Sequence, residues 1–127
     1  MKKIIKTPKA PMPIGPYNQA VISNNTLYIS GQIAINPADG ELVTTDIETE
    51  TRQVMENLKA ILTEAGLTFE NVLKSSVFVK DMHLFSRINV IYGQYFDEAT
   101  APARELVEVA NLPKFVNIEI SMIATMG

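Results

Sequence analysis

The stretch TDIETETRQVMENLKAILTEAGLTFENVLKSSVFVK (residues 45–80) contains a pattern of helical period followed directly by a pattern of strand period. Up to Gly66, apolar residues recur at intervals of three and four, which predicts an amphipathic helix. Thr45 and Glu48 have the spacing of a capping box, and Gly66 is placed to be the C-terminal stop. The alternating segment 72–80 then predicts a strand. The apolar stripe of the helix comprises Ile47, Val54, Leu58, Ile61, Leu62 and Ala65.

Two strands joined by a tight turn are expected before this helix. The apolar-rich segments 21–23 and 26–35 flank Asn24-Asn25, a pair that tolerates positive φ and favours a two-residue hairpin turn. The sequence NPADG at 36–40 is a strong turn signal and ends the second strand.

A second helix and two more strands are expected after residue 80. Apolar and aromatic residues recur at helical spacing from about His83 to Asp97, although Gly93 weakens that helix. Segments 103–111 and 116–125 predict strands joined by a short turn at 112–115. The order is ββ-α-β-α-ββ, an α+β fold with a mixed sheet and two helices on one face. No repeat or composition shift marks a boundary, so we expect residues 1–127 to form a single domain.

Composition narrows the functional classes. With 46 % hydrophobic and 20 % charged residues, the chain resembles a soluble globular protein. No apolar run is long enough for a membrane span, and the basic start lacks the apolar core of a secretory signal. The absence of cysteine excludes thiolate catalysis and fits a cytoplasmic location. The net charge of −3 disfavours nucleic-acid binding, and the single histidine offers no basis for a metal site.

Strand alternation divides the predicted sheet into two faces. One face is aliphatic and is expected to pack against the helices; in segment 103–111 it comprises Val107 and Val109. The other face mixes polar and large apolar groups, and two helices cannot cover it, so we expect other subunits to do so. Arg104 and Glu119 are both assigned to this second face. Its members are Tyr28, Ser30, Gln32, Phe78, Arg104, Leu106, Glu108, Glu119 and Ser121.

The stretch APARELVEVANLPK (101–114) places a guanidinium where a strand enters the sheet. Three interpretations of Arg104 are possible: a solvated edge charge, a structural ion pair with Glu119 or Glu108, and an anchor for an anionic ligand. A covered face makes the solvated edge the weakest of these. The other two stay open on the pattern alone.

Five motifs in order and in register resemble the Rid/YjgF family of reactive intermediate (imine/enamine) deaminases. They are GPYNQAV (15–21), YISGQI (28–33), VFVKDM (77–82), PARELVEVANLPK (102–114) and IEISMIA (118–124). The resemblance covers the chain from about Ile4 to Thr125. It implies a chorismate-mutase-like α+β fold and a homotrimer with sites in the clefts between subunits.

The resemblance also implies an activity that needs neither cofactor nor metal. Deaminases of this family hydrolyse 2-imino or 2-enamino acids, of the 2-iminopropanoate and 2-iminobutanoate type, to 2-keto acids and ammonia. These intermediates leak from dehydratases that depend on pyridoxal phosphate. The family's carboxylate-binding arginine corresponds to Arg104, and its water-orienting glutamate to Glu119. The predicted substrate contacts are Tyr17, Ser30, Gly31, Asn89 and Leu106.

The chain departs from the family pattern after the arginine. Relatives commonly have a serine and then a small residue there, whereas this chain has Glu105 and Leu106. Glu105 is predicted to point away from the pocket. Leu106 is expected to serve chiefly through its backbone N–H, while its bulk narrows the pocket or alters substrate preference. A non-catalytic binding or regulatory protein that uses the same cleft is the alternative, and an RNA-acting protein is a weaker one.

Overall fold

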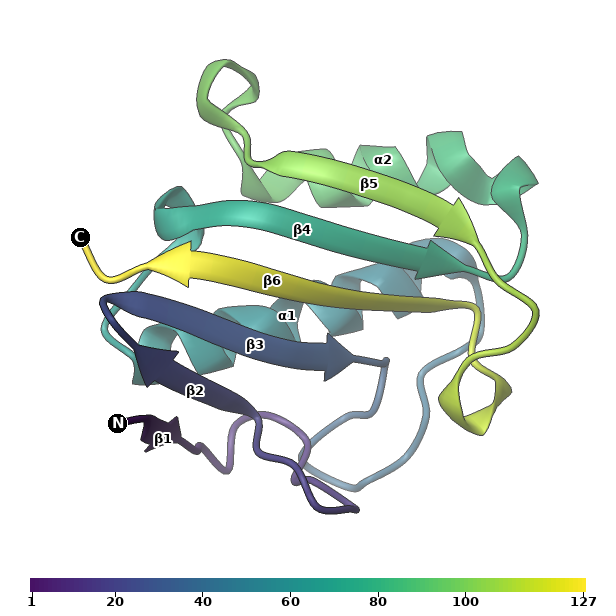
Figure 1. Cartoon of the computed structure of the whole chain (residues 1–127). Coiled ribbons are helices and arrows are strands. Elements are labelled where there is room, and N and C mark those ends of the chain that lie inside the picture. The colour runs from purple at the N-terminus through teal and green to yellow at the C-terminus, as the bar shows by residue number, and fades with distance from the viewer.

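The computed structural model describes all residues 1–127, which form one six-stranded sheet and two α-helices (Figure 1). The strands follow the order β1-β2-β3-β6-β4-β5, and all neighbours are antiparallel except the parallel pair β4 and β5. The α+β mixed sheet is confirmed, with β1 as an edge strand that was not predicted. The elements are β1 (Lys3–Ile5), β2 (Ala20–Ser23), β3 (Thr26–Gln32), α1 (Ile47–Glu64), β4 (Val72–Val79), α2 (Phe85–Tyr92), β5 (Ala103–Glu108) and β6 (Ile118–Thr125).

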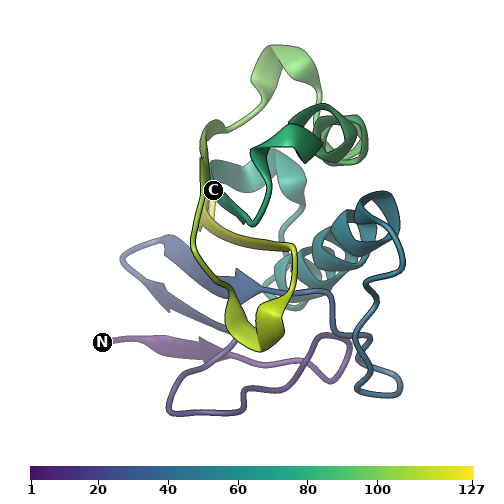
Figure 2. The same ribbon diagram turned by 90° about the vertical axis from the view of Figure 1, so that its right-hand side faces the viewer.

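Both helices cover the same face of the sheet (Figure 2). Each helix connects two parallel strands: α1 leads from β3 to β4 and α2 from β4 to β5, in the same direction across the sheet. Crossovers of this kind are nearly always right-handed, so two that step the same way place their helices on one side. Neither helix has an apolar segment long enough to cross a membrane.

The start of α1 differs from the prediction by one residue. Asp46, not Thr45, is the N-cap, and its Oδ1 accepts a hydrogen bond from Thr49 N at 2.7 Å. The helix ends before Gly66, whose φ of +78° confirms its role as the C-terminal stop. Glu50 of α1 is buried, and its carboxylate binds Asn117, the residue before β6.

The second helix is shorter than predicted. A 3₁₀ turn at Met82–Leu84 precedes α2, and a second 3₁₀ turn begins at Gly93, so segment 83–97 is not one continuous α-helix. Glycine has a low helix propensity, and the aromatic residues after it have partners elsewhere. The ring of Phe96 packs on Tyr92, with 4.8 Å between the centroids, and on Phe69, at 5.3 Å.

The hairpin turn between β2 and β3 is confirmed, since Asn24 and Asn25 have φ values of 48° and 66°. The predicted alternation of β3 fails at its end, however. Its register with β6 shifts between Ile29 and Gln32, which is a β-bulge, and Gln32 turns toward the core instead of away from it. The final two strands are also shorter than predicted, because β5 ends at Glu108 and β6 begins at Ile118.

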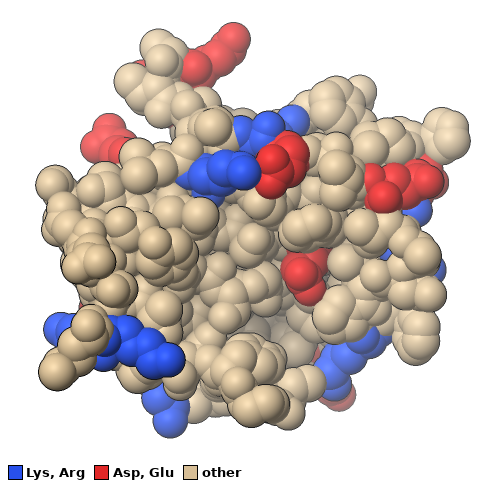
Figure 3. Space-filling view, in the orientation of Figure 1, with Lys and Arg blue, Asp and Glu red and all other residues tan.

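The face of the sheet away from the helices is open and poor in charge. Figure 3 shows it as a mostly uncharged surface with an acidic spot near its middle. Large apolar side chains on it are accessible: Tyr28 is 47 % exposed and Val107 40 %. An apolar sheet face of this kind is typical of an interface with another protein chain.

Candidate functional site

Arg104 lies on the edge strand β5, and its guanidinium is held by α2. Its Nη1 donates a hydrogen bond to Asn89 Oδ1 at 2.7 Å. The guanidinium carbon lies 4.9 Å from the ring centroid of Tyr92 and 6.0 Å from that of Phe85. The Tyr92 hydroxyl in turn donates to the buried Ser75 Oγ at 2.8 Å, and burial raises the pKa of this tyrosine. Arg104 is therefore braced by an amide and an aromatic ring.

No carboxylate of the chain neutralises Arg104. The ion pairs all lie elsewhere; they are Lys74–Glu105, Arg87–Glu48 and, when the imidazole is protonated, His83–Asp81. A half-buried guanidinium with one hydrogen-bonded partner retains free donors in the planar arrangement that matches a carboxylate. The alternative of an ion pair between Arg104 and Glu119 or Glu108 is not found within the single chain. The geometry favours an external anion as the partner.

The predicted face of Arg104 is also wrong. In the parallel register of β4 and β5, Arg104 lies beside Ser75 and Leu106 beside Val77, and both of these β4 residues are buried on the helix side. Arg104, Leu106 and Glu108 thus point toward the helices, whereas Val107 points to the open face. The segment ARELVE has an apolar residue on each of its faces, so alternation alone assigned it to the wrong one.

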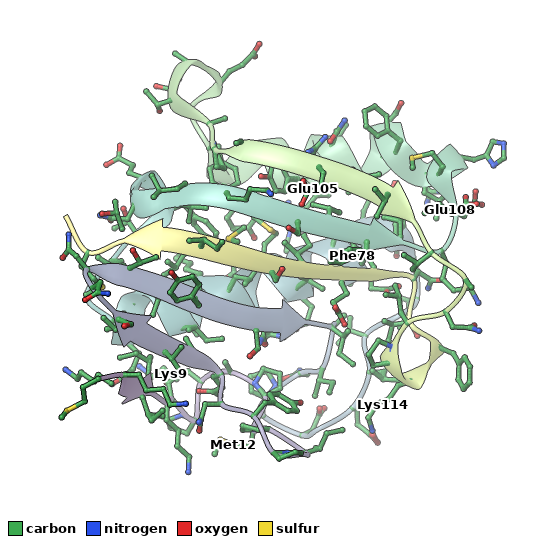
Figure 4. All side chains as sticks on the ribbon, in the orientation of Figure 1. Lys9, Met12, Phe78, Glu105, Glu108 and Lys114 are labelled. Carbon is green, nitrogen blue, oxygen red and sulfur yellow. The ribbon has the colours of Figure 1, made fainter.

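The two residues at which the chain departs from the family pattern have separate environments. Glu105 points to the opposite side of β5 from Arg104, onto the open face that also carries Glu119 (Figure 4). There it accepts a hydrogen bond from Ser76 Oγ at 2.9 Å and pairs with Lys74 at 3.1 Å, and these contacts hold the pKa of its carboxyl below its usual range. Leu106 is half-buried and packs against the core, next to Arg104 on the same face.

Glu119 lies on the open face, opposite Phe78 of β4. The carboxylate forms no hydrogen bond or ion pair within the chain, and burial raises its pKa above the ordinary value of 4.5. The backbone two residues earlier is firmly held, because the carboxylate of Glu50 accepts from both Asn117 N and Asn117 Nδ2 at 2.8 Å. Glu119 is an unpaired carboxylate on a well-anchored strand.

Ser30 and Gly31 lie at the β-bulge of β3. The Ser30 hydroxyl donates to Asn18 O at 2.6 Å, and Ser30 N donates to Gln19 O at 2.9 Å. These bonds fasten the end of the 6–19 loop to β3. Gly31 lies next to the Glu119 carboxylate, which occupies the space above it. The structure thus brings together two predicted site residues, Gly31 and Glu119.

Tyr17 belongs to the exposed loop before β2, and it lines a small hollow together with Gly31. The loop is organised by Gln19, which is buried. Its Oε1 accepts from Thr7 N at 2.7 Å, and its Nε2 donates to the carbonyls of Thr7 and Pro11 at 3.0 and 2.9 Å. Gln19 was not singled out from the sequence, because a buried amide that binds backbone groups leaves no periodic signal.

The predicted site residues therefore form two groups. Tyr17, Ser30, Gly31 and Glu119 gather at the open face, whereas Arg104, Asn89 and Leu106 gather between β5 and α2. Sequence reasoning missed Tyr92 and Phe85 in the second group. Tyr92 is three residues after Asn89 on a helix, so the two share a face, and this spacing was an available signal. No three acidic or histidine side chains are close enough to hold a metal ion.

The mixed sheet backed by two helices on one face is the fold that the resemblance to the Rid/YjgF family implied. A family model described as Endoribonuclease L-PSP matches residues 7–126, so the chain belongs to this family and the resemblance is confirmed.

Individual relatives match over nearly the whole chain. A RutC family protein of Synechocystis is 53 % identical over 125 residues, covering 98 % of this chain and 96 % of the relative. The 2-iminobutanoate/2-iminopropanoate deaminase of Bos taurus is 46 % identical over 127 residues, covering 100 % of this chain and 92 % of that protein. Among solved structures, E. coli TdcF with bound serine has a TM-score of 0.92 at 43 % identity, covering 98 % of this chain and 99 % of TdcF.

Proposed function

We propose that the protein hydrolyses 2-imino acids, or their 2-enamino tautomers, to 2-keto acids and ammonia. The observation that carries this proposal is Arg104, a half-buried guanidinium braced by Asn89 and Tyr92 and left without a carboxylate partner. Such a group provides a fixed, bidentate anchor for the substrate carboxylate. The similarity to the deaminase of Bos taurus supports the same substrate class.

Glu119 is assigned the proton-transfer role. Water adds to the imine carbon, so a C–O bond forms while the C=N double bond becomes a single bond. The carboxylate accepts the proton that the water loses, and the nitrogen is protonated and leaves as ammonia when the carbonyl forms. Since the raised pKa of Glu119 makes it a better base than an ordinary carboxylate, it can contribute the roughly 10²–10⁴-fold that proton transfer typically supplies.

The two halves of the site must then come from different subunits. Arg104 points to the helix side of the sheet and Glu119 to the open side, so one chain cannot present both to one substrate. In our proposal the β5–α2 edge of one copy lies against the open face of the next. A heterologous contact of this kind closes into a ring when the rotation permits, and three copies would give the homotrimer that the family resemblance implies.

A coupled assay tests the activity. A dehydratase that depends on pyridoxal phosphate generates the imine, and the release of 2-keto acid is followed with and without the protein. Arg104→Ala is expected to abolish the acceleration while leaving the assembly intact. Arg104→Lys, which keeps the charge but loses the planar donor pair, is expected to retain only part of it. No acceleration by the wild-type protein would refute the proposal.

The alternative is a protein that binds amino or keto acids in the same cleft without turnover. The structure of E. coli TdcF with bound serine favours this possibility, because that relative binds an amino acid. Saturable binding of a 2-keto acid, abolished by Arg104→Ala and unaccompanied by imine hydrolysis, would establish it. Ribonuclease activity, after which the family model is named, is disfavoured by the net charge of −3, and it is dropped if purified protein leaves RNA intact.

A further inference from the structure

The Glu119 carboxylate lies directly over Gly31, with no room between them for a side chain. A Cβ atom built on Gly31 would be 2.6 Å from Oε2 of Glu119, 2.7 Å from its Cδ and 3.0 Å from its Cγ. A real Cβ atom essentially never comes within 3.0 Å of such a neighbour. The carboxyl group therefore lies in the space that any other residue at position 31 would fill.

Space, and not backbone conformation, is what requires glycine here. The glycines with positive φ are Gly40, Gly66 and Gly127, and Gly31 is not among them. An alanine at position 31 is thus compatible with the backbone, and its only conflict is with the end of a flexible side chain. Such a conflict moves the side chain at little cost to the fold.

The β-bulge explains how the glycine comes to lie beside Glu119. Ile29 pairs with Met122 and Gln32 with Ile120, so β3 has one more residue than β6 between these pairs. The extra residue turns Gln32 to the core and leaves Gly31 exposed on the open face, where Glu119 also points.

Within the chain, no polar contact fixes the position of the Glu119 carboxylate above Gly31. It has no hydrogen-bond donor and no cation beside it. We propose that Gly31 is a positioning residue, which lets the Glu119 carboxylate lie flat along β3 toward the hollow lined by Tyr17. This inference rests on the proposed function, because it assumes that Glu119 acts on the substrate water.

The test is the substitution Gly31→Ala, with Gly93→Ala as the matched control. A Cβ at Gly93 meets nothing within 4 Å and its φ is −63°, so the control changes a glycine to alanine without displacing any group. Since a misplacement of ~1 Å can cost about 10²-fold in rate, we expect Gly31→Ala to lower kcat by about 10- to 100-fold. KM should change little, because the substrate carboxylate is bound by Arg104. An unchanged kcat, or a higher KM at unchanged kcat, would overturn the inference.

A shorter acid supplies a second variant. Glu119→Asp withdraws the carboxylate from position 31, so it should lower kcat less in the Gly31→Ala variant than in the wild type. Strictly additive effects of the two substitutions would contradict the inference. If Gly31→Ala fails to fold because of the clash, the double variant Gly31→Ala/Glu119→Asp should recover folding. Failure to recover it would also overturn the inference.

A third measurement does not depend on turnover. In protein with ¹³C-labelled glutamate, the Glu119 carboxyl is assigned by its loss in Glu119→Gln and titrated by NMR. In Gly31→Ala its pKa should move down toward the ordinary value of 4.5, because the displaced carboxyl is better solvated. An unchanged pKa of Glu119 in Gly31→Ala would refute the positioning role of Gly31. Absence of imine hydrolysis in the wild type would refute the proposed function alone.

Discussion

Complementation between two inactive variants is the sharpest test of a site shared between subunits. Arg104→Ala removes the proposed carboxylate anchor and Glu119→Gln removes the proposed base, and each variant alone should lose most of the activity. Within one chain the two residues are two strands and three register positions apart. With ~4.8 Å between strands and ~3.3 Å per residue, their Cα atoms are about 14 Å apart, and their side chains point to opposite faces. No single chain can bring them to one substrate.

The expected magnitude follows from the proposed ring of three, in which each junction would join the β5–α2 edge of one chain to the open face of the next. In an equal, random mixture, a junction is intact when its edge comes from a Glu119→Gln chain and its face from an Arg104→Ala chain. Each condition holds for half of the chains, so about one quarter of the wild-type sites should be restored.

The assay uses the two variants expressed together, or unfolded and refolded together, with the dehydratase-coupled rate measured per protomer. A mixture of Arg104→Ala with Arg104→Met is the matched control. Both variants lack the arginine half of the site, so no junction is restored. If the mixture of Arg104→Ala with Glu119→Gln is no more active than its components, the inter-subunit site is refuted.

Three further predictions follow from single contacts. Because burial raises the pKa of Glu119, kcat/KM should fall as the pH decreases toward an inflection above 4.5, and an acidic limb that persists in Glu119→Gln would contradict its role as base. Tyr92→Leu removes the ring beneath Arg104; a cation–π contact of ~1–2 kcal/mol predicts a KM about 5- to 30-fold higher, whereas Tyr92→Phe keeps the ring and should keep KM near that of the wild type. Phe115 is 74 % exposed with a φ of 56°, so Phe115→Gly should relieve about 1 kcal/mol of backbone strain and raise Tm, and a lower Tm would show that the ring makes a contact worth more.

The helix over residues 47–64 was predictable because its signals are local. An apolar stripe at helical spacing and a terminal glycine act within a few residues of one another, and the structure has both. The cap was misplaced by one residue because Thr45 and Asp46 are both good N-caps, and the choice between them depends on where the preceding loop enters. The extra strand β1 was missed because three residues carry too little periodicity to be recognised.

The candidate site residues were proposed from the sequence, whereas their arrangement required the structure. The family motifs led to Arg104, Glu119 and Asn89, and the structure adds the bond between Arg104 and Asn89. Strand alternation assigned Arg104 to the same face as Glu119, whereas the register of β5 with β4 places Arg104 on the opposite face. The contact of the Tyr92 ring with Arg104 and the close approach of Glu119 to Gly31 were not recognised, because each depends on a neighbour distant in the sequence.

Residue spacing along the chain was sufficient for the element types and for the α+β class, because helix and strand periods are properties of the backbone and act over a few residues. The face on which each functional side chain lies required the folded sheet. The period of a strand is two, so one extra residue in β3, or an ambiguous register in β5, exchanges the two faces. That choice is made by hydrogen bonds to other strands, and for this reason the separation of Arg104 from Glu119 is visible only in the three-dimensional fold.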